Sequence, residues 1–597
     1  MNAYDDLPPP PPPPLGAQFP QPPPHPSPVV DESPPSADSA GSETKPSHAR
    51  RTVAGALVAV VVAGAVAGGI LAFRFVRGTA DSAVTMVPSD SALYANFNLD
   101  PPGSQKMALN DLFNKFPAVN SESQRDTWVN LALDNLGTKA GFTHADVRPW
   151  LGPQLAVAAQ ESAFGRPATP SHAAAFAFLI SSTDDGKAQA TLDKLRGAAF
   201  SGYTWSKQTH DGVQLTVGQG NGTPVVSAIV NHMVVLAGST DFVNEMIDTA
   251  HGKHASLDST DAYKTALSQL PGDRLALLYV SVPELLKQLG GIGGAFGGTS
   301  ASTQRELADA YRGIGAALVA SSDGIAITAV QDYDSSKLPA DLKAVLTVPA
   351  DQNGALALVP GHAYGFLTLT GLRQDLQYFA SAFSSVSPFG GSPTLDELGI
   401  TGPNGVISHL TGDAGFEVDN VSGSNMPAGA FLFATDTGAS AQTFLDNLAA
   451  TVCQKTSQCS TSQETKQSHS GVSITSLPFG SDAPAGVSPS WAVAGNWGIF
   501  ASSVDEVKTI IDSRSNGGIG ASPDYVAISS HINSPNNAAL YLDIRAIVSA
   551  IRKVLPAEAQ VLFDTTVAPN LNPVKGLAIS GSNSPDHSSS TLFLQIG

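Results

Sequence analysis

The two cysteines are the residues of this sequence whose type and spacing most directly suggest chemistry. Cys453 and Cys459 stand six positions apart in CQKTSQC, and the sequence has no other cysteine. In an oxidising compartment such a close pair forms a disulfide, and closing so short a loop stabilises a fold by roughly 2 kcal/mol. A redox site favours CxxC spacing, and a metal site needs more ligands nearby. We therefore expect a disulfide.

Other chemically capable residues form no recognisable site. His251 and His254 in HGKH lack acidic or cysteine neighbours, and zinc needs three or four convergent ligands, so we expect a surface loop there. The glycine run GGIGGAFGG (290–298) matches neither GxGxxG nor the P-loop and indicates a flexible connector. GxSxG and HExxH are absent. We assign no catalytic, cofactor-binding or metal-ligating residue, although a non-sequential triad could escape such motifs.

The composition is acidic and sparsely charged. The net charge is −19, charged residues make up 14% of the chain, and 42% of the residues are hydrophobic, enough for large buried cores. Proteins that neutralise phosphates carry a basic surface, so the composition argues against nucleic-acid binding.

Residues 1–51 form a proline-rich tail with PPPPPPP at 8–14 and DESPPSADSAGSE at 31–43. Proline fixes φ and removes backbone donors, so this tail is predicted to be disordered or polyproline II. It is either a solvated spacer or a ligand for a proline-recognising partner in the cytoplasm.

An uncharged segment follows at 52–73, TVAGALVAVVVAGAVAGGILAF. Its 22 residues would reach about 33 Å as a helix, enough for a bilayer core of roughly 30 Å. A cleaved signal peptide has a shorter leader and a shorter apolar run. Lys45, Arg50 and Arg51 outweigh Arg74 and Arg77, so the tail should stay cytoplasmic. These features predict a single-pass anchor in a bacterial cell membrane, with the C-terminal part exported.

The exported part contains a long internal repeat. LAGSTDFVNEMID (236–248) parallels FASSVDEVKTIID (500–512), each preceded by two apolar strands around a two-residue turn. YKTALSQLPGDRLALLY (263–279) likewise parallels YVAISSHINSPNNAALY (525–541). Ser503 and Glu506 have the spacing of a capping box. We predict an α+β fold with two tandem pseudo-repeats of antiparallel sheet and packed helices, at 84–345 and 350–597.

This pattern resembles a bacterial family of unknown function, the domain of unknown function 3352. The resemblance rests on the VPSDSALY opening (87–94), the strand PWLGPQLAVA (149–158), and the helix–turn–strand STDAYKTAL…LPGD…YV, and it covers roughly 84–597. The family has no assigned active site to transfer.

Two classes of function remain. The first is a non-catalytic envelope module that binds an envelope protein or an apolar ligand in a groove between the copies. The second is an envelope hydrolase with an unrecognised site. Buried acids or histidines converging in a cleft would favour the hydrolase, and an apolar groove would favour the binding module.

The predicted anchor makes the membrane topology testable. A reporter enzyme fused after Gly597 should be active only outside the cytoplasm, because the positive charges at 45–51 hold the tail inside. Protease added to intact spheroplasts should spare the tail. Cytoplasmic activity of the C-terminal fusion would contradict the assignment.

Overall fold

The computed structural model describes residues 81–138, 140–160, 163, 175–220, 224–289, 301–382, 400–401, 405–420, 427–456, 459–478 and 487–597. The predicted tail (1–51), the predicted anchor (52–73) and the glycine run (290–298) lie outside these residues. The described residues all belong to one compact unit of the chain. A search of the described residues finds no helix with the length and apolarity needed to span a bilayer.

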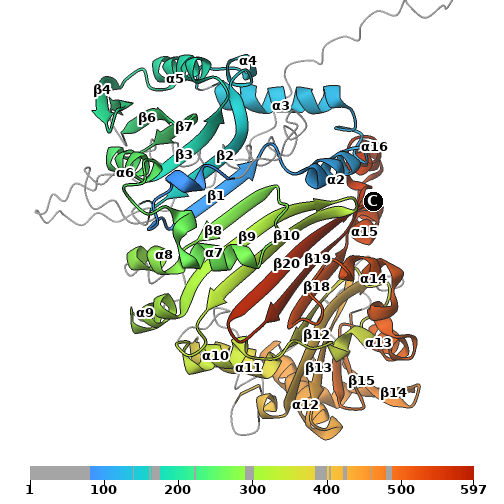
Figure 1. The fold of residues 1–597 in the computed structure, drawn as a ribbon. Coiled ribbons are helices and arrows are strands. Elements are labelled where there is room, and N and C mark those ends of the chain that lie inside the picture. The colour runs from blue at the N-terminus through green and yellow to red at the C-terminus, as the bar shows by residue number, and fades with distance from the viewer. Residues whose placement is uncertain are drawn as a thin grey trace, which may run out of the picture. The chain divides into compact units, whose positions relative to one another are not determined.

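The strands of the described residues form one 20-stranded sheet in which neighbouring strands run antiparallel (Figure 1). The first ten strands are β1 (Leu93–Asn98), β2 (Leu151–Ala159), β3 (Phe176–Ser182), β4 (Thr204–His210), β5 (Val213–Gln219), β6 (Val225–Val230), β7 (Met233–Ala237), β8 (Ala276–Val280), β9 (Tyr311–Ser321) and β10 (Gly324–Tyr333). The second ten are β11 (Gly365–Thr370), β12 (Leu410–Asn420), β13 (Pro427–Thr435), β14 (Thr465–His469), β15 (Val472–Ser476), β16 (Ser490–Ala494), β17 (Trp497–Ala501), β18 (Ala538–Asp543), β19 (Val574–Asn583) and β20 (His587–Ile596).

Both halves of the sheet have the same strand order. The first half runs β4-β5-β6-β7-β3-β2-β1-β8-β9-β10. The second runs β14-β15-β16-β17-β13-β12-β11-β18-β19-β20, so each strand number rises by ten. The α+β class with an antiparallel sheet is confirmed. The limits of two separate domains at 84–345 and 350–597 remain predictions.

The two halves meet at a seam between β10 and β20. Backbone pairing runs from Gly324 opposite Gln595 to Asp332 opposite His587, with Thr328 facing Thr591 at its midpoint. Each seam strand is the second strand of a hairpin, β9–β10 or β19–β20. Because the pairing is continuous there, a ligand surface at the seam has to be a face of the sheet, not a gap between two bodies.

Helices cover both faces of the sheet. In the described residues they are α2 (Gly103–Phe113), α3 (Glu122–Gly137), α4 (His144–Val147), α5 (Asp185–Ala199), α6 (Thr240–Ala250), α7 (Asp261–Ser268), α8 (Val282–Leu289), α9 (Ala301–Ala310), α10 (Ala340–Leu346), α11 (Leu372–Ala382), α12 (Gly438–Thr456), α13 (Val504–Asn516), α14 (Pro523–Ser529), α15 (Ile544–Val554), α16 (Ala557–Leu562) and α17 (Ala568–Leu571). We call the face covered by α6, α7, α13 and α14 face A, and the opposite face, covered in part by α2, α3, α5 and α12, face B. Figure 1 shows α7 lying across β8 and β9.

The hairpins and helices follow from local sequence. Val230 pairs with Met233 across the predicted turn Asn231-His232, whose φ values of 48° and 60° suit a tight hairpin. The helix after each such hairpin begins at a serine, Ser239 or Ser503, whose side chain accepts a hydrogen bond from the third helical backbone N–H. The predicted strand–turn–strand–helix repeat is therefore present at both places.

Gly324 in the seam has no room for a side chain. A Cβ there would lie 2.3 Å from the Leu594 carbonyl oxygen and 2.5 Å from the Phe593 ring. We expect Gly324→Ala to lower the free energy of unfolding by about 1–3 kcal/mol through overpacking. Gly581→Ala on β19 is the matched control, because its Cβ would meet nothing closer than the Ser589 carbonyl oxygen at 4.0 Å. Equal denaturant midpoints for both variants would contradict this reading.

Candidate functional site

An unbroken row of large apolar side chains crosses the middle of face B. Its members face one another directly on six neighbouring strands, β10, β20, β19, β18, β11 and β12. They are Ile327, Leu592, Ile579, Leu540, Leu367 and Phe416, and we call them the apolar row. Directly opposed side chains share a face of the sheet, so the row is a property of the register.

In the described residues the apolar row is largely open to solvent, whereas helices cover the same face of the sheet on both sides of it. Toward one end of the sheet, α2 packs on Leu318 and α3 on Leu155, and toward the other, α12 packs on Phe431. None of the six residues of the apolar row belongs to a hydrophobic core cluster of the described residues. The exposed fractions are 42% for Ile327, 36% for Ile579, 37% for Leu367 and 49% for Phe416.

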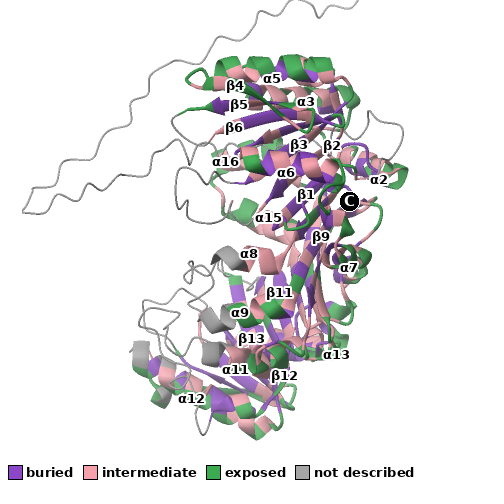
Figure 2. Ribbon diagram, turned by 60° about the vertical axis from the view of Figure 1, so that its left-hand side comes forward, coloured by how far each residue is buried: buried purple, intermediate pink, exposed green. Residues whose placement is uncertain are grey.

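Exposure of this kind is unusual for the interior strands of a sheet. Figure 2 shows the more common arrangement, with buried residues concentrated in strands such as β5 and β6 and exposed residues on the helix α5. A contiguous exposed apolar surface rimmed by polar residues is typical of a binding site.

At three of four corresponding positions of face B, the first half carries smaller side chains, and at the fourth both halves have leucine. Pairing places Ala316, Leu278, Ala95 and Val157 where the second half has Ile579, Leu540, Leu367 and Phe416. The same backbone therefore forms without a row of large exposed residues, and the apolar row is not needed for folding.

On face A, three acidic side chains of the second half converge beneath α13. Glu417 and Asp419 lie on β12, two residues apart and therefore on one face, and Glu506 lies in the first turn of α13. Their exposed fractions are 0%, 1% and 4%, and one carboxylate oxygen of each lies within 4.8 Å of the others. At that distance two ionised carboxylates repel by about 3 kcal/mol at an effective dielectric constant near 20. We call these three residues the carboxyl cluster.

The carboxyl cluster has few hydrogen-bond donors around it. Neither carboxylate oxygen of Glu417 has a hydrogen-bond partner, and neither does Oε1 of Glu506. Asp419 is paired with His362, whose Nε2 lies 3.0 Å from its Oδ2 and whose side chain is two-thirds exposed. The carboxyl cluster is thus buried but adjoins solvent through the His362 side chain.

Burial and mutual repulsion raise the pKa values in the carboxyl cluster. Desolvation raises the pKa of Glu417, and the negative charges of Glu506 and Asp419 raise it further. Desolvation also raises the pKa of Glu506, with the charge of Asp419 adding to it. The hydrogen bond to Asp419 raises the pKa of His362. At neutral pH the carboxyl cluster therefore retains a proton that ordinary glutamates would lose.

The first half fills the corresponding space with apolar side chains. Ala158 faces Tyr94 across β1 and β2 as Glu417 faces Phe366 across β11 and β12. Phe242 is the third residue of α6, as Glu506 is of α13, and Ala158 and Phe242 are 0% and 1% exposed. The fold itself therefore does not call for glutamates at these places.

The predicted capping box at Ser503 and Glu506 is only half formed. The Ser503 side chain accepts a hydrogen bond from the Glu506 backbone N–H at 3.1 Å. The reciprocal bond, from the Ser503 N–H to the Glu506 carboxylate, is absent from the described residues, because that carboxyl group is directed toward Glu417. The prediction of a complete box was wrong, and this glutamate belongs to the carboxyl cluster.

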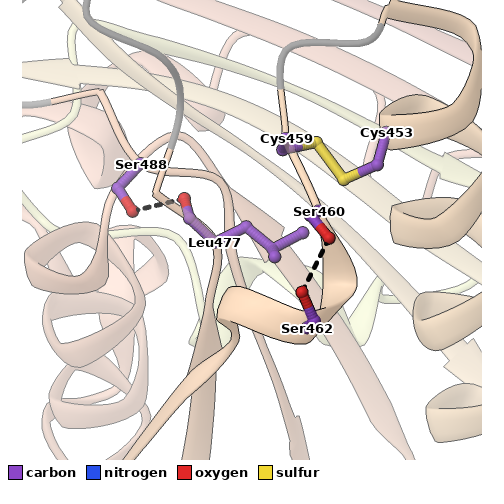
Figure 3. The surroundings of a disulfide bond; sticks show 6 residues. All are labelled: Cys453, Cys459, Ser460, Ser462, Leu477 and Ser488. Carbon is purple, nitrogen blue, oxygen red and sulfur yellow. Dashed lines mark hydrogen bonds between the residues drawn. A yellow bond between two sulfur atoms is a disulfide. The ribbon is translucent and has the colours of Figure 1, made fainter.

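The predicted disulfide between Cys453 and Cys459 is confirmed, with Cα atoms 4.8 Å apart (Figure 3). Cys453 lies in the last turn of α12, and both cysteines pack against the core beneath α12. In Figure 3 the bridge adjoins the turn in which the hydroxyls of Ser460 and Ser462 are hydrogen-bonded. The bridge thus ties the end of α12 to that turn.

The histidines singled out from the sequence do not form a site together. His251 ends α6 and is paired with Asp211, which also binds Lys253 at 2.8 Å. Among the described residues the one group of three or more potential metal ligands within reach of one another is the carboxyl cluster. Two hollows formed by the described residues lie elsewhere, one beside β1 and β8 and one among α15–α17.

The model of a family described as protein of unknown function, DUF3352, matches residues 52–596. The chain belongs to this family. The match spans nearly the whole length, including the predicted anchor, and confirms the resemblance drawn from the sequence motifs.

Comparison with other proteins adds little to this assignment. No curated protein matches the sequence. Among solved structures, crystal form III of TP0453 is 13% identical over 47% of this chain and 90% of its own, with a TM-score of 0.23. Crystal form I of the same protein is 12% identical over 43% of this chain and 79% of its own, with a TM-score of 0.21. Such low scores carry no argument about fold or function.

The raised pKa values predict how stability depends on pH. A carboxyl group whose folded pKa exceeds its unfolded value binds more protons when folded, so stability falls as pH rises above about 4.5. His362 acts in the same direction, because its raised pKa stabilises the fold at low pH. In the presence of a chelator, we expect the melting temperature to fall more steeply between pH 5 and pH 8 in the native protein than in Glu417→Ala/Glu506→Phe, which installs the residues of the first half. Identical slopes would contradict the assignment.

Proposed function

We propose that this DUF3352 protein is a membrane-anchored, extracytoplasmic binding module, and that its apolar row holds an acyl chain of an envelope lipid without catalysing a reaction. The observation that carries the proposal is the continuous apolar row on six neighbouring strands, in which Ile327, Ile579, Leu367 and Phe416 are exposed and Leu592 and Leu540 are half-buried. Burying such side chains against an apolar ligand is favourable by roughly 25 cal/mol per Å².

The length of the apolar row supports an acyl chain as its occupant. Five spacings between neighbouring strands, at about 4.8 Å each, span about 24 Å. One leaflet of a bilayer is about 15 Å thick in its hydrocarbon region, half of roughly 30 Å. An acyl chain from such a leaflet would lie along the apolar row within its length.

The predicted anchor supports a ligand drawn from the membrane. Residues 74–80 separate the predicted anchor from the first described residue, and seven residues reach at most about 25 Å. The folded part would therefore stay close to the lipid headgroups. The segment from α15 to α17 exposes a further group of apolar side chains suited to such a position: Ile551, Val554, Val561, Leu562 and Val567, the last in the π-helical turn between α16 and α17.

An envelope hydrolase is the second candidate, and the carboxyl cluster with His362 is the observation that favours it. Acid–base catalysis needs groups within hydrogen-bonding reach of the substrate. Glu417, Asp419 and Glu506 are at most 4% exposed, so a substrate bond could not reach them without an opening of face A. Because these three acids are buried, we favour the binding module over the hydrolase.

The test is binding of a fluorescent long-chain fatty acid to the purified, delipidated full-length protein. We expect saturable binding that weakens at least tenfold, about 1.4 kcal/mol, in Leu367→Ala/Phe416→Val. These changes install the side chains of Ala95 and Val157 and should leave the circular dichroism spectrum and melting temperature nearly unchanged. Val526→Ala is the matched control, because Val526 is 51% exposed but lies on α14, on face A.

Three outcomes would overturn the proposal. One is the absence of saturable binding. Another is a dimer that needs Leu367 and Phe416 while the fatty acid does not bind, which would make a second copy the occupant. The third is turnover of envelope esters or amides that is lost in Glu417→Gln with the fold intact, which would favour the hydrolase.

A further inference from the structure

We infer that Glu417, Asp419 and Glu506 form a binding site for one divalent metal cation, present in the second half of the sheet and missing from the first. The site lies on face A, opposite the apolar row, and the inference does not depend on the proposed lipid binding. Its ligand class follows from the donors, because carboxylate oxygens suit Ca²⁺, Mg²⁺ and Mn²⁺.

The geometry has room for a cation at its centre. One carboxylate oxygen from each of the three residues lies within 4.8 Å of the other two. Oxygens bound on opposite sides of Ca²⁺ are about 4.6–5.2 Å apart, and those around Mg²⁺ about 4 Å, since the bond lengths are near 2.3–2.6 and 2.0–2.1 Å. The spacing of the three side chains is therefore that of a coordination shell.

The unpartnered oxygens point to a missing ligand. Glu417 is fully buried with both carboxylate oxygens unsatisfied, and Glu506 has one unsatisfied oxygen. Buried polar atoms in folded proteins are nearly always paired, and a buried carboxylate without a partner is costly. A cation bound among the three side chains would satisfy these oxygens together.

The charge balance agrees with one divalent ion. Each carboxylate that binds the ion contributes one negative charge, and several such ligands around one ion are typical of divalent cations. The N-terminus of α13 also directs a partial positive charge toward Glu506, but only about half an elementary charge. Asp419 lies next to the exposed His362, so this edge of the carboxyl cluster provides the approach from solvent.

The first half shows that the fold does not need the two glutamates of the carboxyl cluster, which favours a role in ligand binding. Ala158 and Phe242 occupy the corresponding positions in the first half and are as well buried as the glutamates. Gln160 corresponds to Asp419, and its amide donates to Glu245 at 2.7 Å, so that acid is already satisfied. Among the described residues, the first half has one buried carboxylate oxygen without a partner, Oδ1 of Asp185, whose side chain is partly exposed and pairs with His232 through its other oxygen. Only in the second half do fully buried acids of the described residues have unpartnered oxygens side by side.

The experiment uses the full-length protein, stripped with a chelator and dialysed, with Ca²⁺, Mg²⁺ and Mn²⁺ as separate probes. We expect at least one of them to bind with a stoichiometry of one by calorimetry and to raise the melting temperature. Glu417→Gln/Glu506→Gln should weaken that binding at least tenfold. Glu417→Ala/Glu506→Phe should abolish it while the protein stays folded, because the first half folds with those residues. Glu245→Gln, which changes the satisfied acid of the first half, should leave metal binding unchanged.

Two results would contradict the metal site. If none of the three metals binds at this stoichiometry, the inference is wrong, and a pH-dependent melting temperature without any metal response would assign the carboxyl cluster to a shared proton instead. Metal binding that persists in both double variants would place the ion elsewhere and also overturn the inference. Because the apolar row is untouched in these variants, fatty-acid binding should be unchanged, so the two proposals can fail separately.

Discussion

The backbone hydrogen bonds between β10 and β20 hold the two halves of the sheet in one register. Through them Ile327 of the first half faces Leu592 of the second on face B, while Ala326 faces Phe593 on face A. Successive residues of a strand point to opposite faces, so a slip of one residue at this seam would exchange the apolar row for residues meant for the core. The core of the second half, which Phe593 joins, and the open surface beyond it both depend on this pairing.

The two halves share a strand order but have diverged in side chains on both faces. On face B the second half has larger side chains at three positions that are Ala, Ala and Val in the first, and on face A it has two glutamates where the first has Ala and Phe. Neither change improves packing, since one exposes apolar surface and the other buries unsatisfied acids. Deviations from what folding requires are expected at functional sites.

Much of the fold could be predicted from the sequence because it rests on local signals. The turn at Asn231-His232 and the helix starts at Ser239 and Ser503 are encoded by neighbouring residues, and their repetition after about 264 positions indicated a shared strand order. The disulfide was predictable for the same reason, since Cys453 and Cys459 are close in the sequence. The α+β class followed from the alternation of these elements.

The candidate sites could not be predicted, because their residues are brought together only by long-range pairing. Glu417 and Glu506 are far apart in the sequence, and the spacing from Ser503 made Glu506 look like a helix cap. Each residue of the apolar row sits in a strand that alternates in the ordinary way, and nothing in one strand tells which face the helices will leave open. The corresponding residues of the two halves carried the signal, but their meaning required the register.

The sheet of the described residues has two edge strands, β4 and β14, and the sequence of each disfavours the addition of a further strand. In the described residues β4 and β14 each pair on one side alone, and both strands are mostly exposed and polar, with Lys207 and Lys466 along them. Charged and polar edge strands discourage the addition of further strands from other molecules. A sheet in which two similar halves are joined edge to edge is thereby kept from adding further copies and continuing into a fibre.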